Sequence, residues 1–223
     1  NFDEENREPP PKTGHDRWPS PVLQKLDDID AQVVSDVSAN TWGALPDGTW
    51  ATTRAGALKR LKFFITQLLP IFGEHEDAML QSNWHLAHSL LSPYLNNGLL
   101  LPGEVVRAAE EAFLAGKVPI NSAEGFVRQI IGWREYIWNC YWRWGPEYKD
   151  LNALNAQRPL PALFTSRDST KMRCVQSSLQ HIYDRAYSHH IERLMVLGNF
   201  ALISGVNPQE FTRWMWNSYV DAA

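Results

Sequence analysis

The chain has 223 residues, of which 44% are hydrophobic and 21% are charged, and its formal net charge is −4. This composition is ordinary for a soluble globular protein, and the length allows one large domain or two small ones. A net negative charge excludes a basic field over the whole protein, so any contact with nucleic acid would need a local basic surface.

Targeting and redox signals are weak. No run of about 18 apolar residues predicts a membrane span, and the acidic, proline-rich start NFDEENREPPPK is unlike a signal peptide. The two cysteines, Cys140 and Cys174, form no CxxC pair, so alone they indicate neither a zinc site nor a redox motif. We therefore expect a cytoplasmic protein without membrane contact. The chain lacks an initial Met and stops at SYVDAA in an apparent helix, so we interpret it as a fragment.

The first half of the chain predicts an irregular segment followed by helices. Residues 1–52 are rich in Pro, Asp and Gly, and we expect them to wrap over a surface with one short helix at 21–25. Apolar residues at helical spacing over 57–69 predict a helix that begins near Thr53. Pro70 is expected to kink it, and further helical or apolar segments are predicted at 78–81 and 93–100.

The second half of the chain predicts mainly helices. Pro102 suits a first helical position and opens a helix that ends before Gly116, and residues 121–124 form a cap for a long helix through Trp144. After a loop at 146–169, one continuous helix is predicted over 170–204, and the segment Asn-Pro-Gln-Glu at 207–210 starts the last helix. No strand alternation is convincing, so the predicted fold class is all-α, with residues 53–223 as one helical domain.

Three stretches carry residue types suited to chemistry. The first is YSHHIERLMVLGNF, where His189, His190 and Arg193 lie three or four apart and share one side of a helix. The simplest interpretation is a solvated helix face paired with Asp184 or Glu192. Adjacent histidines on a helix point about 100° apart, which argues against a shared metal ion.

The second stretch is HSLLSPYLNNG, in which Ser89 and Ser92 flank leucines before a helical segment. Hydroxyls and free backbone N–H groups at a helix start suit phosphate, and simple Ser caps on an apolar helix explain the pattern equally well.

The third stretch is GFVRQIIGWREYIWNCYWRW, where arginines alternate with tryptophans. Such a helix either stacks on flat rings and holds phosphates or is a Trp-rich core helix with snorkelling arginines. Gly132 costs a helix interior about 1 kcal/mol relative to Ala, so we expect a close approach there by a ligand or another helix.

Taken together, the motifs resemble those of a known family. HSLLSPYLNNGLLLPGEVV resembles the flavin-phosphate segment of photolyases and cryptochromes, with His88 in place of a Thr, and GWREYI resembles their W-R-E-F/Y helix. RQIIGWREY, KMRC and HHIERLMVLGNFAL are similar to the iron–sulfur bacterial cryptochromes and related photolyases, which include prokaryotic (6-4) photolyases. The resemblance covers most of the chain.

The resemblance implies a helical FAD-binding domain that lacks the family's N-terminal α/β antenna domain and its C-terminal end. By matching positions, Ser89, Leu91 and Ser92 would hold the FAD pyrophosphate, and Trp133 and Arg134 would line the pocket. A lumazine-type antenna would belong to the absent N-terminal domain.

For activity, the resemblance implies light-driven electron transfer from FAD to (6-4) photoproducts in UV-damaged DNA by a monomer. His190 would be the proton donor to the lesion with His189 as its neighbour, and Arg193 would contact flavin and lesion. Arg128, Arg143 and Arg185 would join Arg193 in a basic rim for DNA. Imidazole suits the acid role because its pKa lies near working pH.

The resemblance also implies an iron–sulfur cluster. Cys174 matches the first of four cysteine ligands to a [4Fe–4S] cluster, and the other three would lie beyond this chain. Cys140 has no such match and is expected to be a buried thiol. The family carries a Trp eight residues before the cluster Cys, where this chain has Ser166. That departure motivates an alternative function, a blue-light photoreceptor that binds FAD and repairs nothing.

Overall fold

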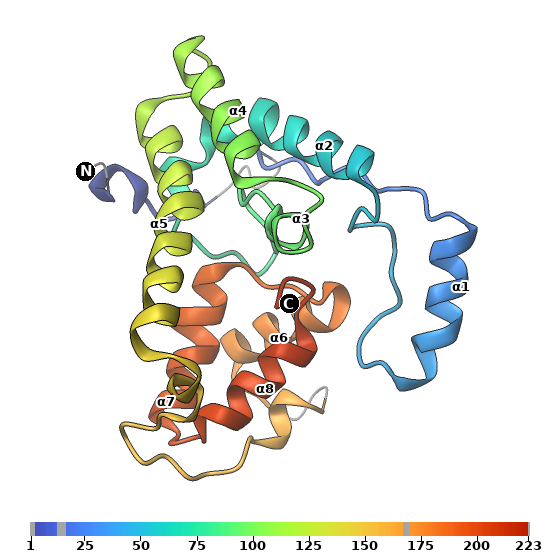
Figure 1. Cartoon of the computed structure of the whole chain (residues 1–223), viewed down its shortest axis with the longest axis vertical. Coiled ribbons are helices and arrows are strands. Elements are labelled where there is room, and N and C mark those ends of the chain that lie inside the picture. Colours follow the sequence, from blue (N-terminus) through green and yellow to red (C-terminus); the bar gives the residue numbers. More distant parts are fainter. Residues whose placement is uncertain (1–2, 13–16, 167–169, 223) are drawn as a thin grey trace. The chain divides into compact units, whose positions relative to one another are not determined.

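A computed structural model describes residues 3–12, 17–166 and 170–222 (Figure 1). Within these ranges the regular structure is helical, and β pairing is limited to two isolated bridges, Leu80 with Asn83 and Arg158 with Val206. The all-α prediction is therefore confirmed. The α-helices are α1 (Asp28–Val37), α2 (Arg54–Phe63), α3 (Ser92–Asn96), α4 (Pro102–Leu114), α5 (Ile120–Trp144), α6 (Arg173–Arg185), α7 (Asn199–Ile203) and α8 (Pro208–Ser218).

The chain divides into two compact units. Unit 1 comprises Asn1–Thr41 and Leu45–Tyr136, and unit 2 comprises Trp42–Ala44 and Ile137–Ala223. Each unit has its own buried apolar cluster. The division predicted at residues 52 and 53 stays a prediction about domain organisation, and the two units are described separately below.

Unit 1 is built around the helix that begins after Thr53. The Thr53 side chain accepts a hydrogen bond from the Gly56 N–H and caps α2, as the sequence predicts. The helix then widens into a π-helical segment, η4 (Phe64–Leu68), before the 3-10 turn η5 (Leu69–Ile71). Pro70 explains the change, because proline lacks the N–H that an α-helix would need there.

The core of unit 1 is fully shielded from solvent. Phe64, Leu68, Leu91, Tyr94 and Leu100 are each at most 1% exposed. The hydroxyl of Tyr94 accepts a hydrogen bond from the Ala51 N–H at 3.0 Å, which gives this buried polar atom a partner.

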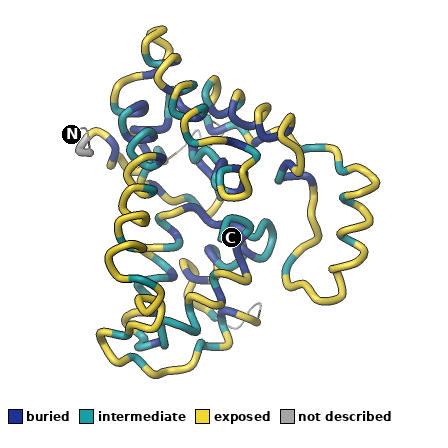
Figure 2. Tube along the Cα trace, in the orientation of Figure 1, coloured by how far each residue is buried: buried dark blue, intermediate teal, exposed yellow. Residues whose placement is uncertain are grey.

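Helix α5 changes character along its length. Its first part is buried, including Gly125, Phe126 and Ile130, whereas the residues after Ile130 are mostly exposed (Figure 2). A Cβ atom at Gly125 would lie 2.7 Å from Glu76 Oε2 and 2.8 Å from Asn6 Nδ2, so a side chain there would displace these two hydrogen-bonded side chains. The buried end anchors the helix, and the exposed end carries the aromatic residues noted in the sequence.

Unit 2 packs α6, α7, α8 and the π-helical segment η9 (Glu192–Gly198) around Phe164, Ile182, Leu197 and Trp214. The Trp214 indole N–H donates to the carbonyl of Phe164 at 2.9 Å, so this buried donor is satisfied. Asn207 caps α8 by accepting from the N–H groups of Gln209 and Glu210, as predicted.

Two short predicted helices are wrong. The helix expected at 21–25 is absent, and α1 begins at Asp28 because Asp27 and Asp30 form a reciprocal capping box there. The helix expected at 78–81 is replaced by turns, and Asn83 Oδ1 accepts from the N–H groups of His85 and Leu86 in an Asx turn just after it.

Two further corrections concern unit 2. The continuous helix predicted over 170–204 is broken, because Ala186 adopts a left-handed conformation with φ of 51° and ends α6. The sequence shows Ala at this position, which gives no warning of the break. The final residues are also not in mid-helix, since α8 ends at Ser218 and Tyr219 is extended.

Candidate functional site

The predicted phosphate-binding segment is a buried turn in unit 1. Leu86 and Leu90 have positive φ values of 45° and 57°, which are rare for leucine, and both side chains are at most 2% exposed. Leu91 is fully buried, whereas Ser89 and Ser92 are half-buried. The Ser89 hydroxyl accepts from the Leu91 N–H at 3.4 Å. Strained turns of this kind cluster at ligand sites, and this one leaves two hydroxyls partly accessible beside anchored leucines.

Trp133 and Arg134 lie on the exposed part of α5 that still belongs to unit 1. The Trp133 indole N–H donates to Gln129 Oε1 at 2.9 Å, and 48% of Trp133 is exposed. Arg134 donates to the carbonyl of Ile130 at 3.1 Å, and partial burial lowers its pKa from the usual value.

A cavity of about 450 Å³ lies along this face, lined by Arg128, Gln129, Gly132, Trp133 and Tyr136. Its aromatic walls suit a planar ligand, and the Arg128 guanidinium beside them is paired with Glu124. Gly132 contributes an open position to this wall. A Cβ atom there would meet only Arg128 Cγ, at 3.7 Å, so the close approach by another helix is not seen among the described residues.

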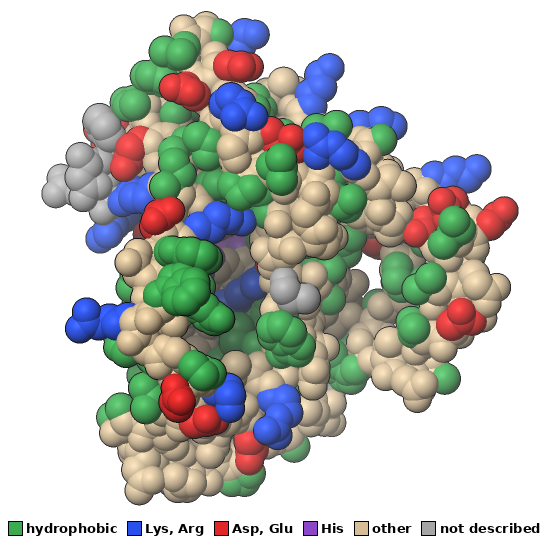
Figure 3. Space-filling model, viewed as in Figure 1, with side chains coloured by type: hydrophobic (Ala, Val, Ile, Leu, Met, Phe, Trp, Pro, Cys, Tyr) green, Lys and Arg blue, Asp and Glu red, His purple; other side chains and the backbone are tan. Residues whose placement is uncertain are grey.

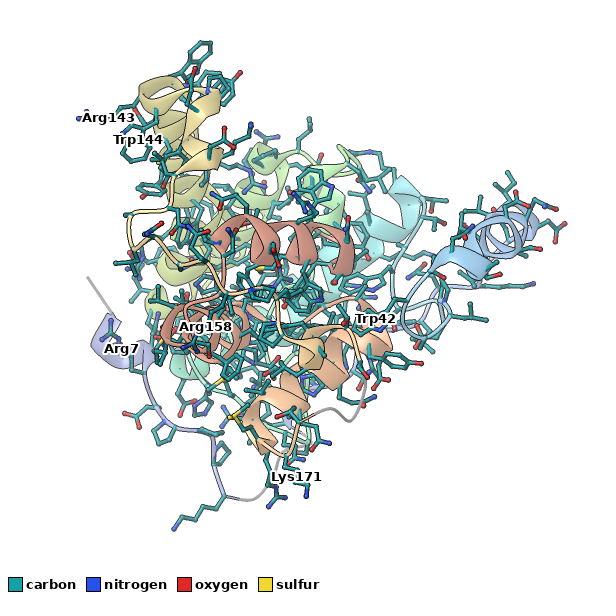
Figure 4. The ribbon with its side chains drawn as sticks, turned by 90° about the horizontal axis from the view of Figure 1, so that it is seen from below. Arg7, Trp42, Arg143, Trp144, Arg158 and Lys171 are labelled. Atoms are coloured by element: carbon teal, nitrogen blue, oxygen red, sulfur yellow. The ribbon has the colours of Figure 1, made fainter. Side chains whose placement is uncertain are left out.

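The remainder of α5 carries a broad aromatic surface. Figure 3 shows apolar side chains gathered over this helix, and Figure 4 labels Arg143 and Trp144 at its end. Trp138, Tyr141 and Trp142 are 60%, 63% and 66% exposed. The interpretation as a Trp-rich core helix is therefore wrong for the part that carries the tryptophans, whereas the start of the stretch, with Phe126 and Ile130, is buried.

The turn between α6 and the next helix carries the two histidines. Ser188 and His189 are fully buried, whereas His190, the first residue of the following helix, is exposed. The solvated-face interpretation is thus wrong for His189 and holds for His190 alone. A turn with one buried and one exposed imidazole gives the two histidines distinct environments.

Arg193 is held in a buried ion pair. Its Nη1 and Nη2 atoms each donate to one oxygen of Asp221 at 2.9 Å, and its Nε donates to the Ser188 carbonyl at 2.6 Å. The guanidinium also lies against the rings of Tyr187 and Tyr219, with its Cζ 5.0 and 4.2 Å from their centroids. Burial alone would lower the pKa of Arg193, and the Asp221 carboxylate more than offsets this, so the pKa lies above its usual value.

A second buried network lies on the other side of the turn. His181 Nδ1 on α6 is 2.9 and 3.2 Å from the two carboxylate oxygens of Glu192, and His189 Nε2 is 3.9 Å from Glu192 Oε2. Glu192 is only 4% exposed. The sequence interpretation missed His181 and Asp221 and named Glu192 only as a partner on a solvated helix face. The spacing of three between His189 and Glu192 is the one signal that pointed to this network.

The two cysteines differ in exposure. Cys174, near the start of α6, is exposed, whereas Cys140 is half-buried rather than buried as expected. No group of three or more His, Cys, Asp or Glu residues in the described part of the chain is arranged to hold a metal ion. Cys174 therefore offers one thiolate, which on its own does not make a cluster site.

Three of the four arginines expected in the basic rim have acidic partners. Arg128 pairs with Glu124 at 3.3 Å, Arg185 pairs with Asp184 at 3.8 Å, and Arg193 is engaged with Asp221. Their positive charges are thus largely balanced locally within each unit.

Comparison with known proteins shows which family the chain belongs to. Over all 223 residues it is 41% identical to a curated protein named (6-4) photolyase from Agrobacterium fabrum, and the match covers 44% of that relative. The chain belongs to the photolyase/cryptochrome superfamily, in the branch of prokaryotic (6-4) photolyases. No family model matches it.

Two weaker similarities accompany this match. The fold resembles the crystal structure of a bacterial class III photolyase from Agrobacterium tumefaciens, with a TM-score of 0.58 and 20% identity, over 90% of this chain and 39% of that one. A segment of 63 residues, 28% of the chain, is 35% identical to an uncharacterized mimivirus protein and covers 48% of it.

The chain thus spans less than half the length of its curated photolyase relative. No helix among the described residues is long and apolar enough to cross a membrane. The expected cytoplasmic location and monomeric state stay predictions.

Proposed function

We propose that the full-length protein is a light-dependent DNA repair enzyme acting on (6-4) photoproducts, and that this chain is part of its FAD-binding region. The observation that carries the proposal is the 41% identity over the whole chain to a relative named (6-4) photolyase. The alternative, a cryptochrome-type photoreceptor, rests on Ser166 at the place of a family tryptophan.

For FAD, the residues of unit 1 have suitable chemistry. Ser89, Leu91 and Ser92 would hold the pyrophosphate, with the two hydroxyls as its polar partners, and Trp133 and Arg134 would line the pocket. The strained turn at Leu90, with Ser89 and Ser92 half-buried, and the pocket on α5 that Trp133 lines support this assignment. When bound, FAD would supply light-driven electron transfer.

In unit 2, His190 would be the acid that protonates the lesion. Its exposure at the start of a helix leaves its ring accessible to a substrate, while buried His189 would support it from within the protein. Imidazole as a group can hold or release a proton near neutral pH, which suits a general acid.

Arg193 would contact flavin or lesion with a restricted set of atoms. Three of its N–H groups donate to Ser188 and Asp221, and a guanidinium has five, so two N–H groups remain for a ligand. Cys174 would supply one thiolate to a [4Fe–4S] cluster, with its other ligands from outside this chain.

The decisive experiment uses the full-length protein and an oligonucleotide that contains one (6-4) photoproduct. We expect the lesion to disappear with catalytic turnover under blue light and to persist in the dark. Bound flavin without turnover would contradict repair and favour the photoreceptor, whereas a protein without flavin would contradict both functions.

A further inference from the structure

The turn that presents His190 has an unusual backbone. Ala186 lies in the left-handed region with φ of 51°, which costs a residue with a Cβ atom about 1 kcal/mol. Its N–H donates to the Ile182 carbonyl at 2.7 Å, and its carbonyl accepts from the Val220 N–H at 2.8 Å. Such a conformation persists only where the surrounding contacts determine it.

One carboxylate connects the two sides of this turn. Glu192, at the start of η9, pairs with His181 on α6, eleven residues earlier in the chain, through both of its oxygens. Nδ1 of His181 lies within hydrogen-bonding distance of both oxygens, and a carboxylate at this place would accept from an N–H there. The second contact, 3.9 Å from Oε2 to Nε2 of His189, reaches into the turn itself.

The burial of this network makes it costly to break. The side chains of His181, Glu192 and His189 are 10%, 5% and 0% exposed. A buried carboxylate that loses its partner keeps the full desolvation penalty, so His181 and Glu192 are mutually dependent.

The helix geometry links the network to His190. Residues of a helix are about 100° apart, so His190 lies roughly 200° from Glu192 around the axis. His189 lies just before this helix and is buried near Glu192, with 3.9 Å between its Nε2 and Glu192 Oε2. When Glu192 holds its side of the helix inward, His190 must face outward, which matches its exposure.

We propose that Glu192 is a positioning residue that fixes the turn presenting His190, with His181 and His189 as its two anchors. The inference rests on the proposed role of His190 as the acid of repair. It assigns Glu192 no contact with flavin or DNA.

The test compares variants of the full-length protein in the illuminated repair assay. Glu192→Ala should lower the repair rate at saturating lesion DNA at least tenfold and leave the apparent KM within about twofold, because the turn is loosened while the DNA surface is kept. Glu192→Gln keeps an oxygen that accepts from His181 and should retain at least half of the rate. Asp184→Ala is the matched control, since Asp184 forms a similar carboxylate contact on α6, with Gln180 at 2.7 Å.

A double-mutant cycle separates a shared role from two independent ones. If Glu192 acts through His181, the Glu192→Ala and His181→Ala pair together should lower the rate no further than the worse single variant. Should Glu192→Ala fail to fold, His181→Leu and His181→Asn give the same comparison, because Asn keeps an N–H near the place of Nδ1 and Leu does not. An unchanged rate in Glu192→Ala, or strictly additive losses, would overturn the proposal.

A second measurement is independent of repair activity. Amide hydrogen exchange across residues 186–193 should accelerate at least tenfold in Glu192→Ala and remain unchanged in Asp184→Ala. If the wild-type protein repairs nothing, the proposed function fails while the exchange result still decides whether Glu192 holds the turn. Unchanged exchange would overturn the inference even in an active enzyme.

Discussion

At the scale of single residues, the buried ion pair of Arg193 and Asp221 is the strongest polar feature of unit 2. The two residues are 28 positions apart in sequence, and their side chains are 20% and 5% exposed. The pair ties the final described residues to the turn at Ser188, so it should matter for stability as well as for any ligand.

Asp221→Ala should lower the free energy of unfolding of the chain by about 3 kcal/mol, because it leaves a buried guanidinium without its counter-ion. Urea denaturation of the chain measures this. Asp150→Ala is the control, since its ion pair with Lys149 is exposed on both sides and should contribute less than about 1 kcal/mol. Equal losses of unfolding free energy in the two variants would contradict a stabilising role of the Arg193–Asp221 ion pair.

The pKa values of the two tyrosines beside the Arg193–Asp221 ion pair predict how the free energy of unfolding depends on pH. Burial raises the pKa of Tyr219 to about 12 and also raises that of Tyr187. The unfolded phenols lose their protons near pH 10, before the folded ones do. Stability should therefore be intact below about pH 10 and fall as pH rises toward 12, by up to about 1.4 kcal/mol per pH unit for each tyrosine.

Tyr219→Phe removes one of these two groups and should make that decline shallower. Unfolding midpoints measured in urea at a series of alkaline pH values give the slope. A variant that loses stability with the same slope as the wild type would show that Tyr219 does not titrate in this way.

At the scale of elements, much of the secondary structure could be predicted because its signals are local. Thr53, Pro102 and Asn207 mark helix starts through chemistry confined to a few neighbouring residues, and the structure confirms all three. The break after α6 could not be predicted, because Ala186 is an ordinary helix former and the contact that bends the backbone comes from Val220. The capping box of Asp27 and Asp30 starts the first helix at Asp28, later in the chain than the helix predicted at 21–25.

In the candidate site, too, local motifs could be predicted and contacts between distant residues could not. The family motifs located Ser89, Trp133 and His190 in the sequence, but partners that are distant in sequence were invisible. His181 and Asp221 lie 11 and 28 residues from the side chains they bind, and no periodicity connects them. The burial of His189 likewise depends on packing that spacing does not encode.

Helix α5 offers a matched test of its two environments. Gly125→Ala should destabilise the chain by about 1–3 kcal/mol, since the new methyl group meets Glu76 and Asn6. Gly132→Ala, seven residues further along the same helix, has room for the methyl group and should stabilise the chain by up to about 1 kcal/mol. Thermal unfolding followed by circular dichroism gives both values. Destabilisation by Gly132→Ala would indicate a close contact at that position.

At the scale of the whole molecule, the candidate residues divide between the two units. The expected FAD ligands Ser89, Leu91, Ser92, Trp133 and Arg134 belong to unit 1, and the histidines, Arg193 and Cys174 belong to unit 2. The chain covers 44% of its curated photolyase relative, and the exposed aromatic residues of α5 form an apolar surface of a kind that proteins seldom leave uncovered. Activity is therefore best measured on the full-length protein.

The most direct measurement is the rate at which the illuminated full-length protein removes a (6-4) photoproduct, compared between His190→Ala and the wild type. We predict that His190→Ala lowers this rate at least a hundredfold, as expected for loss of a general acid. Gln176→Ala, an exposed change on α6, should leave the rate unaltered. Repair at the wild-type rate by His190→Ala would contradict the central claim that the turn after α6 presents the acid of a DNA repair enzyme.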